Sequence, residues 1–408
     1  MSKRVEPEIE TFARIRVVGI GGSGGNAVNH MINSKVRGVE FLVVNSDAQD
    51  LHRSLTKRKI HIGKNLTRGL GTGMNPELGK RAAEETRQQI QEALQGSDMV
   101  FITCGMGGGT GTGASAVVAK IAKEVGALVI AIVTKPFSFE GAQRKDIAER
   151  GLSELKKEVD AFIVIPNDKL ITVVEKMLSL KQAFALCDEV LREAVEGVSD
   201  IIRTPGDINT DFNDIKAVME GAGPTLMGIG VAEGDERAKE AAKRAVNSPL
   251  LDISISGAKG ILWVVAHSDD LGIMEVHEAS KIISESVDKN AKIIWGVMKD
   301  DKLKNGQLRI IVIATGFPEG ASHASHSGAE RSLFSMPAEK REEERGRIYH
   351  EILKREEKPE IKSEKVESVI KEEPIVTATP HKREETPPAP EDDETWGAIP
   401  AFLRRHKK

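Results

Sequence analysis

Cysteine is scarce in this sequence, with two residues in a chain of 408. Two cysteines cannot supply the disulfide framework of a secreted protein, so we expect reduced thiols and a reducing compartment. Cys104 ends an apolar run and Cys187 lies within a helical pattern, and both places are typical of small core residues. The histidines are scattered along the chain, and we predict no side chain as a direct metal ligand.

Long hydrophobic runs are also missing. The run from Ala127 to Val133 has the length of a buried strand, whereas a membrane-spanning helix needs about 20 apolar residues. Residues 1–10 contain no apolar stretch of the kind that a secretory signal requires. We therefore predict a cytoplasmic protein without a transmembrane segment.

An excess of positive charge is absent as well. The chain carries 58 Lys and Arg residues against 62 Asp and Glu residues, which gives a net charge of −4. The two signs are interleaved, so we expect no nucleic-acid partner. The sequence also contains no Gly-x-x-x-x-Gly-Lys-Ser/Thr motif, which excludes a P-loop nucleotide site.

Glycine is abundant by contrast, most densely in the stretch MGGGTGTG at residues 106–113. Successive glycines cost conformational entropy unless the backbone itself is needed at that place. Residues 98–104 are typical of a buried strand, and residues 114–124 carry the apolar stripe of a helix. Backbone N–H groups and a helix N-terminus then surround one point, which predicts a phosphate-binding loop. Thr110 and Thr112 can add hydroxyl donors.

A second glycine motif, GxGxxG at residues 19–24, follows a strand pattern at residues 15–20, and a helix is expected to open at Asn26. This spacing fits the dinucleotide-binding fingerprint, and Asp47 stands where that fingerprint expects an acidic residue. A Rossmann-type NAD enzyme is therefore one interpretation. A third glycine loop at residues 69–73, together with the lack of a hydride-transfer constellation, favours one long phosphate chain instead.

Apolar runs alternate with helical patterns from residue 14 to about residue 167. This order predicts an α/β fold in which a parallel sheet carries helices on both faces, and ligands of such sheets gather at the carboxyl ends of the strands. A long amphipathic helix over residues 179–203 leads into a second, smaller α/β domain. The expected strands are 15–20, 41–45, 60–62, 99–104, 128–133 and 162–165, then 226–231, 261–266, 292–298 and 308–314, with helices at 236–246 and 274–287.

The loop at residues 107–113 resembles the signature loop of the tubulin superfamily, and the chain as a whole resembles the FtsZ family of bacterial cell-division GTPases. The resemblance covers roughly residues 13–318 and about the last dozen residues. Ser23 departs from it, because many relatives have glycine there. Further matching segments are NSDAQ at 45–49, KPFSFEGAQR at 135–144, PNDKL at 166–170, NTDFND at 209–214 and IPAFLRR at 399–405.

The resemblance implies a cytoskeletal GTPase that polymerises head to tail and forms the division ring at the future septum, at mid-cell in the cytoplasm. GTP or GDP with Mg²⁺ is the implied cofactor set. The implied GTP-binding positions are Gly22, Ser23, Gly24, Gly25, Asn26, Gly73, Gly107, Gly108, Gly109, Thr110, Gly111, Glu140, Arg144, Asn167, Phe184 and Asp188.

Two of these positions can also be argued from chemistry. Phe184 and Asp188 are one helical turn apart and share a face. A carboxylate can accept from both N–H groups on one edge of guanine while an aromatic ring stacks on the base. Spacing alone favours plain core packing for Phe184. The resemblance favours base contact for both, and for Asn167, and it assigns Glu140 and Arg144 to the ribose.

Hydrolysis needs a positioned water and neutralisation of charge at the γ-phosphate. The glycine loops contain no lysine, so backbone dipoles and Mg²⁺ must supply much of that neutralisation. Asp211 and Asp214 are the candidate catalytic acids, although acids after a helix are also typical caps and turn formers. The resemblance places both acids and Asn209 in a loop that enters the nucleotide site of an adjoining subunit. Such a heterologous junction propagates an open filament.

The composition changes after Pro318, where Glu, Lys, Arg, Pro and Ser dominate without apolar periodicity. Such a segment cannot bury enough apolar surface to offset ordering, so we expect a disordered linker. The final residues form a candidate partner-binding peptide, which in the FtsZ family engages membrane-tethering division proteins. Its candidate contact residues are Trp396, Ile399, Pro400, Phe402, Leu403 and Arg404.

The predicted organisation therefore has six parts. They are an N-terminal extension at 1–12, a GTP-binding domain at 13–178, a central helix at 179–204, a C-terminal α/β domain at 205–317, a linker at 318–391 and a partner-binding peptide at 392–408. Two alternatives to a division GTPase stay open at this point. One is the NAD enzyme, and the other is a GTP-binding tubulin relative that regulates or scaffolds without dividing cells.

Overall fold

The computed structural model describes residues 13–173, 179–203, 211–248, 255, 257–268, 270–300 and 303–317. Several predicted features lie outside these residues. They are the N-terminal extension at 1–12, Asn209, the linker at 318–391 and the partner-binding peptide at 392–408. The six domain boundaries stay predictions.

The first half of the chain forms a parallel sheet in the order β3-β2-β1-β4-β5-β6. All six predicted strands are present, most of them longer by one or two residues, and the parallel α/β prediction is confirmed. Both faces of β1 and β4 are buried, which explains their nearly continuous apolar sequences. The strands are β1 (Ile15–Ile20), β2 (Val39–Asn45), β3 (Arg58–His61), β4 (Met99–Gly105), β5 (Leu128–Lys135) and β6 (Ala161–Pro166).

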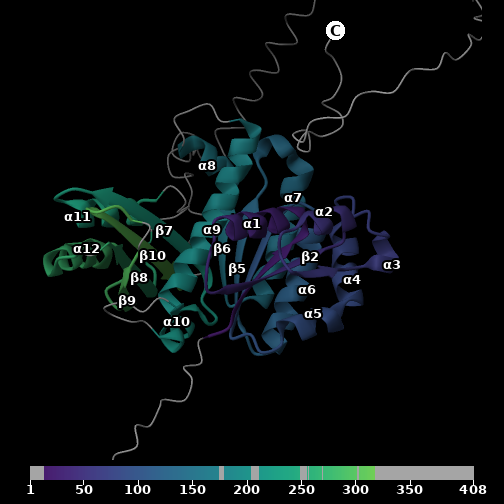
Figure 1. Cartoon of the computed structure of the whole chain (residues 1–408), viewed down its shortest axis with the longest axis horizontal. Coiled ribbons are helices and arrows are strands. Elements are labelled where there is room, and N and C mark those ends of the chain that lie inside the picture. Colours follow the sequence, from purple (N-terminus) through teal and green to yellow (C-terminus); the bar gives the residue numbers. More distant parts are fainter. Residues whose placement is uncertain are drawn as a thin grey trace, which may run out of the picture. The chain divides into compact units, whose positions relative to one another are not determined.

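Helices cover both faces of this sheet (Figure 1). Neighbouring residues of β1 point to opposite faces, so Val17 joins a core with α1 and α9, while Val18 joins a core with α6 and α7. The helical elements are α1 (Gly21–Asn33), α2 (Ala48–Arg53), α3 (Lys64–Thr67), α4 (Pro76–Glu85), α5 (Arg87–Leu94), α6 (Thr110–Glu124), η1 (Ser138–Glu140), α7 (Ala142–Glu158), α8 (Asn167–Val173) and α9 (Leu180–Arg203).

Two helices begin earlier than the sequence pattern predicts. Helix α1 begins at Gly21 instead of Asn26, and α6 begins at Thr110 instead of Ala114. Gly21, Gly22, Gly24 and Gly25 therefore lie in the first turns of α1, and Gly111 and Gly113 in the first turn of α6. The first N–H groups of an α-helix have no partner inside the helix, so this arrangement brings more free donors to the strand ends.

Helix α9 matches the helix predicted at 179–203. Its buried stripe includes Ala183, Cys187, Leu191 and Val198, at the spacing of one helix face. Helix α8 lies beside the end of α9 that begins at Leu180, and α10 lies at the other end (Figure 1).

The second α/β domain is also present. Its elements are α10 (Phe212–Met219), β7 (Gly223–Glu233), α11 (Arg237–Val246), β8 (Gly260–His267), α12 (Ile273–Glu285), β9 (Lys292–Lys299) and β10 (Gln307–Thr315). Strand β10 is antiparallel to both β7 and β8, and β8 is parallel to β9. Two residues of β6, Ala161 and Phe162, pair with the start of β7. Within the described residues, the two predicted domains thus share one sheet of ten strands.

Candidate functional site

A cavity of about 440 Å³ lies at the carboxyl ends of β1, β4, β5 and β6. The sheet rule predicts a ligand site at this edge. Four elements supply most of its wall: the first turns of α1 and α6, the segment after β5, and the first half of α9. The lining residues are Ile20, Gly21, Gly22, Ser23, Asn26, Thr72, Gly105, Met106, Gly108, Gly109, Thr110, Gly111, Thr134, Pro136, Glu140, Arg144, Asn167, Phe184, Cys187, Asp188 and Leu191.

The glycines around the cavity have different physical roles. A Cβ on Gly24 would lie 2.5 Å from the Thr103 carbonyl oxygen, so this glycine allows α1 to pack on β4. A Cβ on Gly109 would lie 2.2 Å from Thr72 Oγ1, so that glycine allows the third glycine loop to approach α6. A Cβ on Gly108 would meet nothing within 4 Å, although Gly108 lines the cavity. Gly108 alone of these three therefore keeps space free for a ligand.

Hydroxyl groups fasten the glycine loops to one another. Thr110 Oγ1 lies 2.6 Å from Ser46 Oγ and 3.1 Å from Thr72 Oγ1. Thr112 Oγ1 accepts a hydrogen bond of 2.9 Å from the Gly107 amide. Thr112 does not line the cavity, so its expected role as a ligand donor is wrong. It holds the signature loop in shape from behind, because its side chain faces the loop backbone instead of the strand ends.

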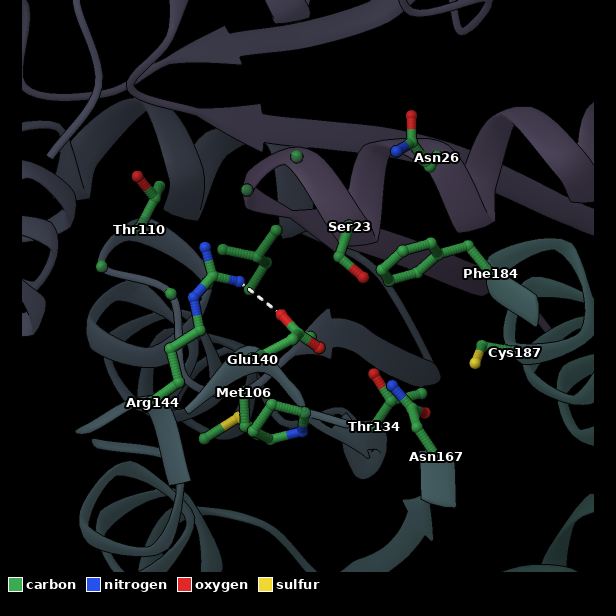
Figure 2. Close-up of a pocket in the computed structure, with 18 of the residues that line it drawn as sticks. Ser23, Asn26, Met106, Thr110, Thr134, Glu140, Arg144, Asn167, Phe184 and Cys187 are labelled. Atoms are coloured by element: carbon green, nitrogen blue, oxygen red, sulfur yellow. Dashed lines mark hydrogen bonds and ion pairs between the residues drawn. The ribbon is translucent and has the colours of Figure 1, made fainter. Parts of the chain in front are cut away.

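Glu140 and Arg144 form an ion pair on the cavity wall. Arg144 Nη1 donates to Glu140 Oε2 at 2.5 Å, as the dashed line in Figure 2 marks. The Phe137 amide donates to the other carboxylate oxygen, Glu140 Oε1, at 2.9 Å. Both oxygens of Glu140 are therefore engaged before any ligand arrives.

On the α9 side of the cavity, an aromatic ring lies near a carboxyl group with a raised pKa and near a buried amide oxygen that has no hydrogen-bond partner among the described residues. The Phe184 side chain is 42% exposed, so plain core packing, the interpretation that spacing favours, is wrong. Burial raises the pKa of Asp188 to about 6, more than the nearby His30 lowers it. Asn167 is 4% exposed, and its Oδ1 has no hydrogen-bond partner among the described residues. An unpaired buried acceptor is costly, and this one would be relieved by a ligand donor.

Both cysteines are buried, as predicted. Burial raises the pKa of Cys104 and of Cys187 to about 12, so each stays a neutral thiol at physiological pH. Cys187 also lines the cavity beside Asp188, which the sequence pattern did not indicate.

The structure gathers most of the predicted GTP-binding residues around one cavity. Gly24, Gly25 and Gly107 belong to the loops but do not line it, and Gly73 adjoins the lining residue Thr72. Nine lining residues are not among the predicted binding positions: Ile20, Gly21, Thr72, Gly105, Met106, Thr134, Pro136, Cys187 and Leu191. Thr134 and Pro136 directly follow the predicted strand at 128–133, so the strand-end rule could have found them.

Asp211 and Asp214 do not line this cavity. They stand at the start of α10, where Asp211 Oδ1 accepts a hydrogen bond of 2.8 Å from the Asp214 amide. The 24 residues of α9 separate them from the Phe184 end, and at 1.5 Å per residue that helix is about 36 Å long. The acidic pair therefore cannot act in the cavity of its own chain.

Two kinds of feature are absent from the described part of the chain. Among the residues that the structure describes, no group of three His, Cys, Asp or Glu side chains is arranged to hold a metal ion. Within the same residues, no helix has the length and apolar character needed to cross a membrane.

Comparison with known proteins gives consistent matches. Residues 14–175 match the family model described as "Tubulin/FtsZ family, GTPase domain", and residues 223–318 match "FtsZ family, C-terminal domain". An empty FtsZ dimer from M. jannaschii is 47% identical, covers 75% of this chain and 89% of its own, and has a TM-score of 0.71. A tryptophan-to-tyrosine mutant of FtsZ from M. jannaschii is 46% identical, with coverages of 75% and 92% and a TM-score of 0.71.

A more distant structure shares the fold alone. CetZ2 from Haloferax volcanii, solved as a GTPγS-bound protofilament, is 22% identical over 84% of this chain and 99% of its own, with a TM-score of 0.65. The GTPase-domain match includes all three glycine loops, so the NAD-enzyme interpretation is wrong. The chain belongs to the FtsZ family of tubulin-like proteins, and it is a GTP-binding, polymerising cytoskeletal GTPase.

Proposed function

We propose that the cavity binds GTP in one orientation. The guanine lies against α9, with Phe184 on its face and Asp188 and Asn167 along its polar edge. The ribose lies near Glu140 and Arg144, and the phosphates extend toward Gly108 and the start of α6. The arrangement of the wall supports this order, because Phe184 and Asn167 lie on one side of the cavity and Thr110 on the opposite side, with Arg144 and Glu140 between (Figure 2).

The proposal rests chiefly on the two ends of the cavity, because each end suits a different part of GTP. One end offers a buried carboxylate with a free amide acceptor, which suits the N–H donors of guanine and leaves adenine unpaired. The other end offers helix N-termini and glycine backbone, which suit an anion. The cavity is also large enough for a nucleotide, since small-molecule sites span about 300–1,000 Å³.

We further propose that Mg²⁺ accompanies the bound triphosphate. Mg²⁺ keeps several waters and binds substrate phosphates with one or two carboxylates at most. When bound, the ion would neutralise charge on the transferred phosphoryl group. Among the chain's own residues, the amides at the starts of α1 and α6 orient that group.

The acidic pair supplies the remaining part of the site, in our proposal, from a second copy of the chain. Asp211 and Asp214 would orient the attacking water at the γ-phosphate of the neighbour, with Asn209 in the same loop. The length of α9 between the two half-sites supports this division. A contact between opposite ends of identical subunits is heterologous, and it generates a filament.

GTP turnover measured across protein concentrations tests this function. We expect turnover per molecule to be near zero in dilute, monomeric protein and to rise above a threshold concentration. Constant specific activity down to demonstrably monomeric protein would refute the shared site. Static light scattering on the same samples reports whether filaments form at the same threshold.

At the level of the cell, we propose that the filaments form the division ring at mid-cell, in the cytoplasm. The peptide at residues 392–408 would dock to membrane-tethering division proteins, and no nucleic-acid partner is expected. Family membership supports this role. A labelled chain in dividing cells tests it: a band at the septum supports the ring, while label spread along the cell supports the scaffold alternative.

A further inference from the structure

We propose that Phe137 is a positioning residue that fixes both the guanine-stacking ring and the ribose carboxylate of the GTP site. The inference rests on the proposed nucleotide orientation and adds a residue that does not itself line the cavity. Phe137 lies two residues after the end of β5 and is 1% exposed. It is thus a rigid part of the core placed immediately behind the nucleotide wall.

Phe137 contacts Phe184, the proposed guanine-stacking residue. The Phe137 and Phe184 rings meet edge to face, with centroids 5.3 Å apart and an interplanar angle of 83°. Such T-shaped pairs are a favoured geometry, because the positive edge of one ring meets the negative face of the other. Phe184 is 42% exposed, and Phe137 is the aromatic ring that the structure records in contact with it among the described residues. Its presentation to the base therefore depends on Phe137.

The backbone of Phe137 also holds Glu140, the proposed ribose carboxylate. The Phe137 amide donates to Glu140 Oε1 at 2.9 Å, and the Glu140 amide donates back to the Phe137 carbonyl at 3.0 Å. This reciprocal pair closes η1 and aims the second carboxylate oxygen at Arg144. Because the ring of Phe137 anchors the backbone that makes these bonds, a change in the ring shifts Glu140 as well.

A matched control lies two residues away. The Phe139 ring stacks on Phe137 at 4.9 Å with an angle of 13°, on the same structural segment. Phe139 is 60% exposed and does not line the cavity. It shares the local sequence and an aromatic contact with Phe137, but it touches neither Phe184 nor Glu140 in any contact that the structure gives for the described residues.

The test compares Phe137→Leu with Phe139→Leu in the full chain, by calorimetric binding of GDP at dilute protein. Loss of the ring contact and of the ribose clamp predicts about a tenfold lower affinity for Phe137→Leu. We expect less than about a twofold change for Phe139→Leu, since no nucleotide contact depends on it. Unchanged GDP affinity in Phe137→Leu would overturn the proposal.

Inorganic triphosphate serves as a second probe, because it lacks both base and ribose. Phe137→Leu should bind triphosphate as the wild type does. An equal loss of triphosphate and GDP affinity would indicate general damage to the fold and would overturn the positioning role. Thermal unfolding without nucleotide measures independently whether the variant is as stable as the wild type.

A double-mutant cycle with Phe184→Leu gives the decisive readout. If Phe137 acts in part through Phe184, the double variant should lose less affinity than the product of the two single losses. Losses that multiply would overturn the coupling while leaving the GTP site intact. Failure of the wild-type protein to bind GDP would instead refute the proposed nucleotide site on which this inference rests.

Discussion

Asp188 is the residue whose chemistry is most altered by its surroundings. Burial raises the pKa of its carboxyl to about 6, against an ordinary value of 3.8. The group therefore remains mainly ionised at pH 7, as an acceptor for two guanine N–H donors must be. Because this pKa is higher than that of an exposed aspartate, the carboxylate becomes protonated near pH 6. We therefore expect nucleotide binding to depend on pH in a range that binding assays cover.

We expect GDP affinity to fall as pH decreases through about 6. Below the pKa of the free protein, binding requires loss of the carboxyl proton, so the affinity should drop about tenfold per pH unit. Calorimetry between pH 5 and pH 8 measures this slope. Asp188→Asn is the control, because it binds more weakly at pH 7 and cannot titrate; an identical slope in that variant would assign the pH dependence to another group.

Gly108 and Gly109 have different roles. Gly108 leaves room for a ligand, and Gly109 allows two segments of the protein to pack closely. A methyl group on Gly108 meets no protein atom within 4 Å, so Gly108→Ala should fold normally and bind GTP at least about tenfold more weakly through intrusion on the phosphates. A Cβ on Gly109 would lie 2.7 Å from the Asn75 amide nitrogen. Gly109→Ala should lower the unfolding temperature before any nucleotide is added. Equal thermal stabilities of the two variants would contradict this assignment.

From the sequence alone, we expect Gly109→Val to lose GTP binding, because the valine would occupy the phosphate path. In the structure, the first atom that a side chain at Gly109 meets is Thr72 Oγ1, on the protein itself. Weak GTP binding by a Gly109 variant would therefore report displacement of the third glycine loop.

At the scale of the element, α9 links the two proposed half-sites. Its first turns carry Phe184 and Asp188, and its far end leads toward α10 and the acidic pair. Between them, Glu189 accepts from His30 of α1 at 2.7 Å and from Arg192 at 2.6 Å. The bond from His30 holds α1 against α9, and the bond from Arg192, within α9, fixes the Glu189 carboxylate that accepts it.

Asp214→Ala should bind GTP normally and form filaments, yet hydrolyse GTP at least about tenfold more slowly, because its carboxylate acts on the water in a partner's cavity. Single-turnover hydrolysis in preformed filaments measures the chemical step directly. A normal rate would show that the catalytic assignment is wrong.

Asp211 needs a different variant. Its Oδ1 accepts from the Asp214 amide and caps α10, so Asp211→Ala also removes a helix cap worth about 1 kcal/mol. Asp211→Ser keeps a capping oxygen and removes the carboxylate. We expect slow hydrolysis with little change in the unfolding temperature for the serine variant, whereas slow hydrolysis in the alanine variant alone would indicate a structural role.

At the scale of the whole molecule, one sheet of ten strands joins the nucleotide half to the second domain through β6 and β7. Three buried clusters support it, and the third packs α11 and α12 on β8 and β10. Each subunit of a filament is therefore one continuous framework, with the cavity near one end of α9 and the acidic pair near the other.

Removal of residues 396–408 should leave GTP turnover and filament formation nearly unchanged, because residues between 13 and 317 line the cavity and form the described cores. Binding to a membrane-tethering division protein should be lost. Turnover assays and pull-down with the purified tether measure the two properties. Reduced GTPase activity, or intact tether binding, would contradict a separable docking peptide.

Local sequence determined much of this protein. Apolar period and glycine placement predicted all ten strands, the long helix α9 and the edge of the sheet where the cavity lies. These features follow from short-range patterns, because the apolar periodicity of a strand or a helix is encoded by residues close together in the sequence. The loop at 106–113 indicated phosphate binding for the same reason.

Tertiary structure decided the features that depend on residues distant in sequence. Gly24 must be small because the Thr103 carbonyl lies against it, and Thr112 faces Gly107 instead of the cavity. Phe137 meets Phe184 across 47 positions of the chain. No periodicity encodes such meetings, since they arise only when the helices and strands pack, and burial then sets the charge state of Asp188.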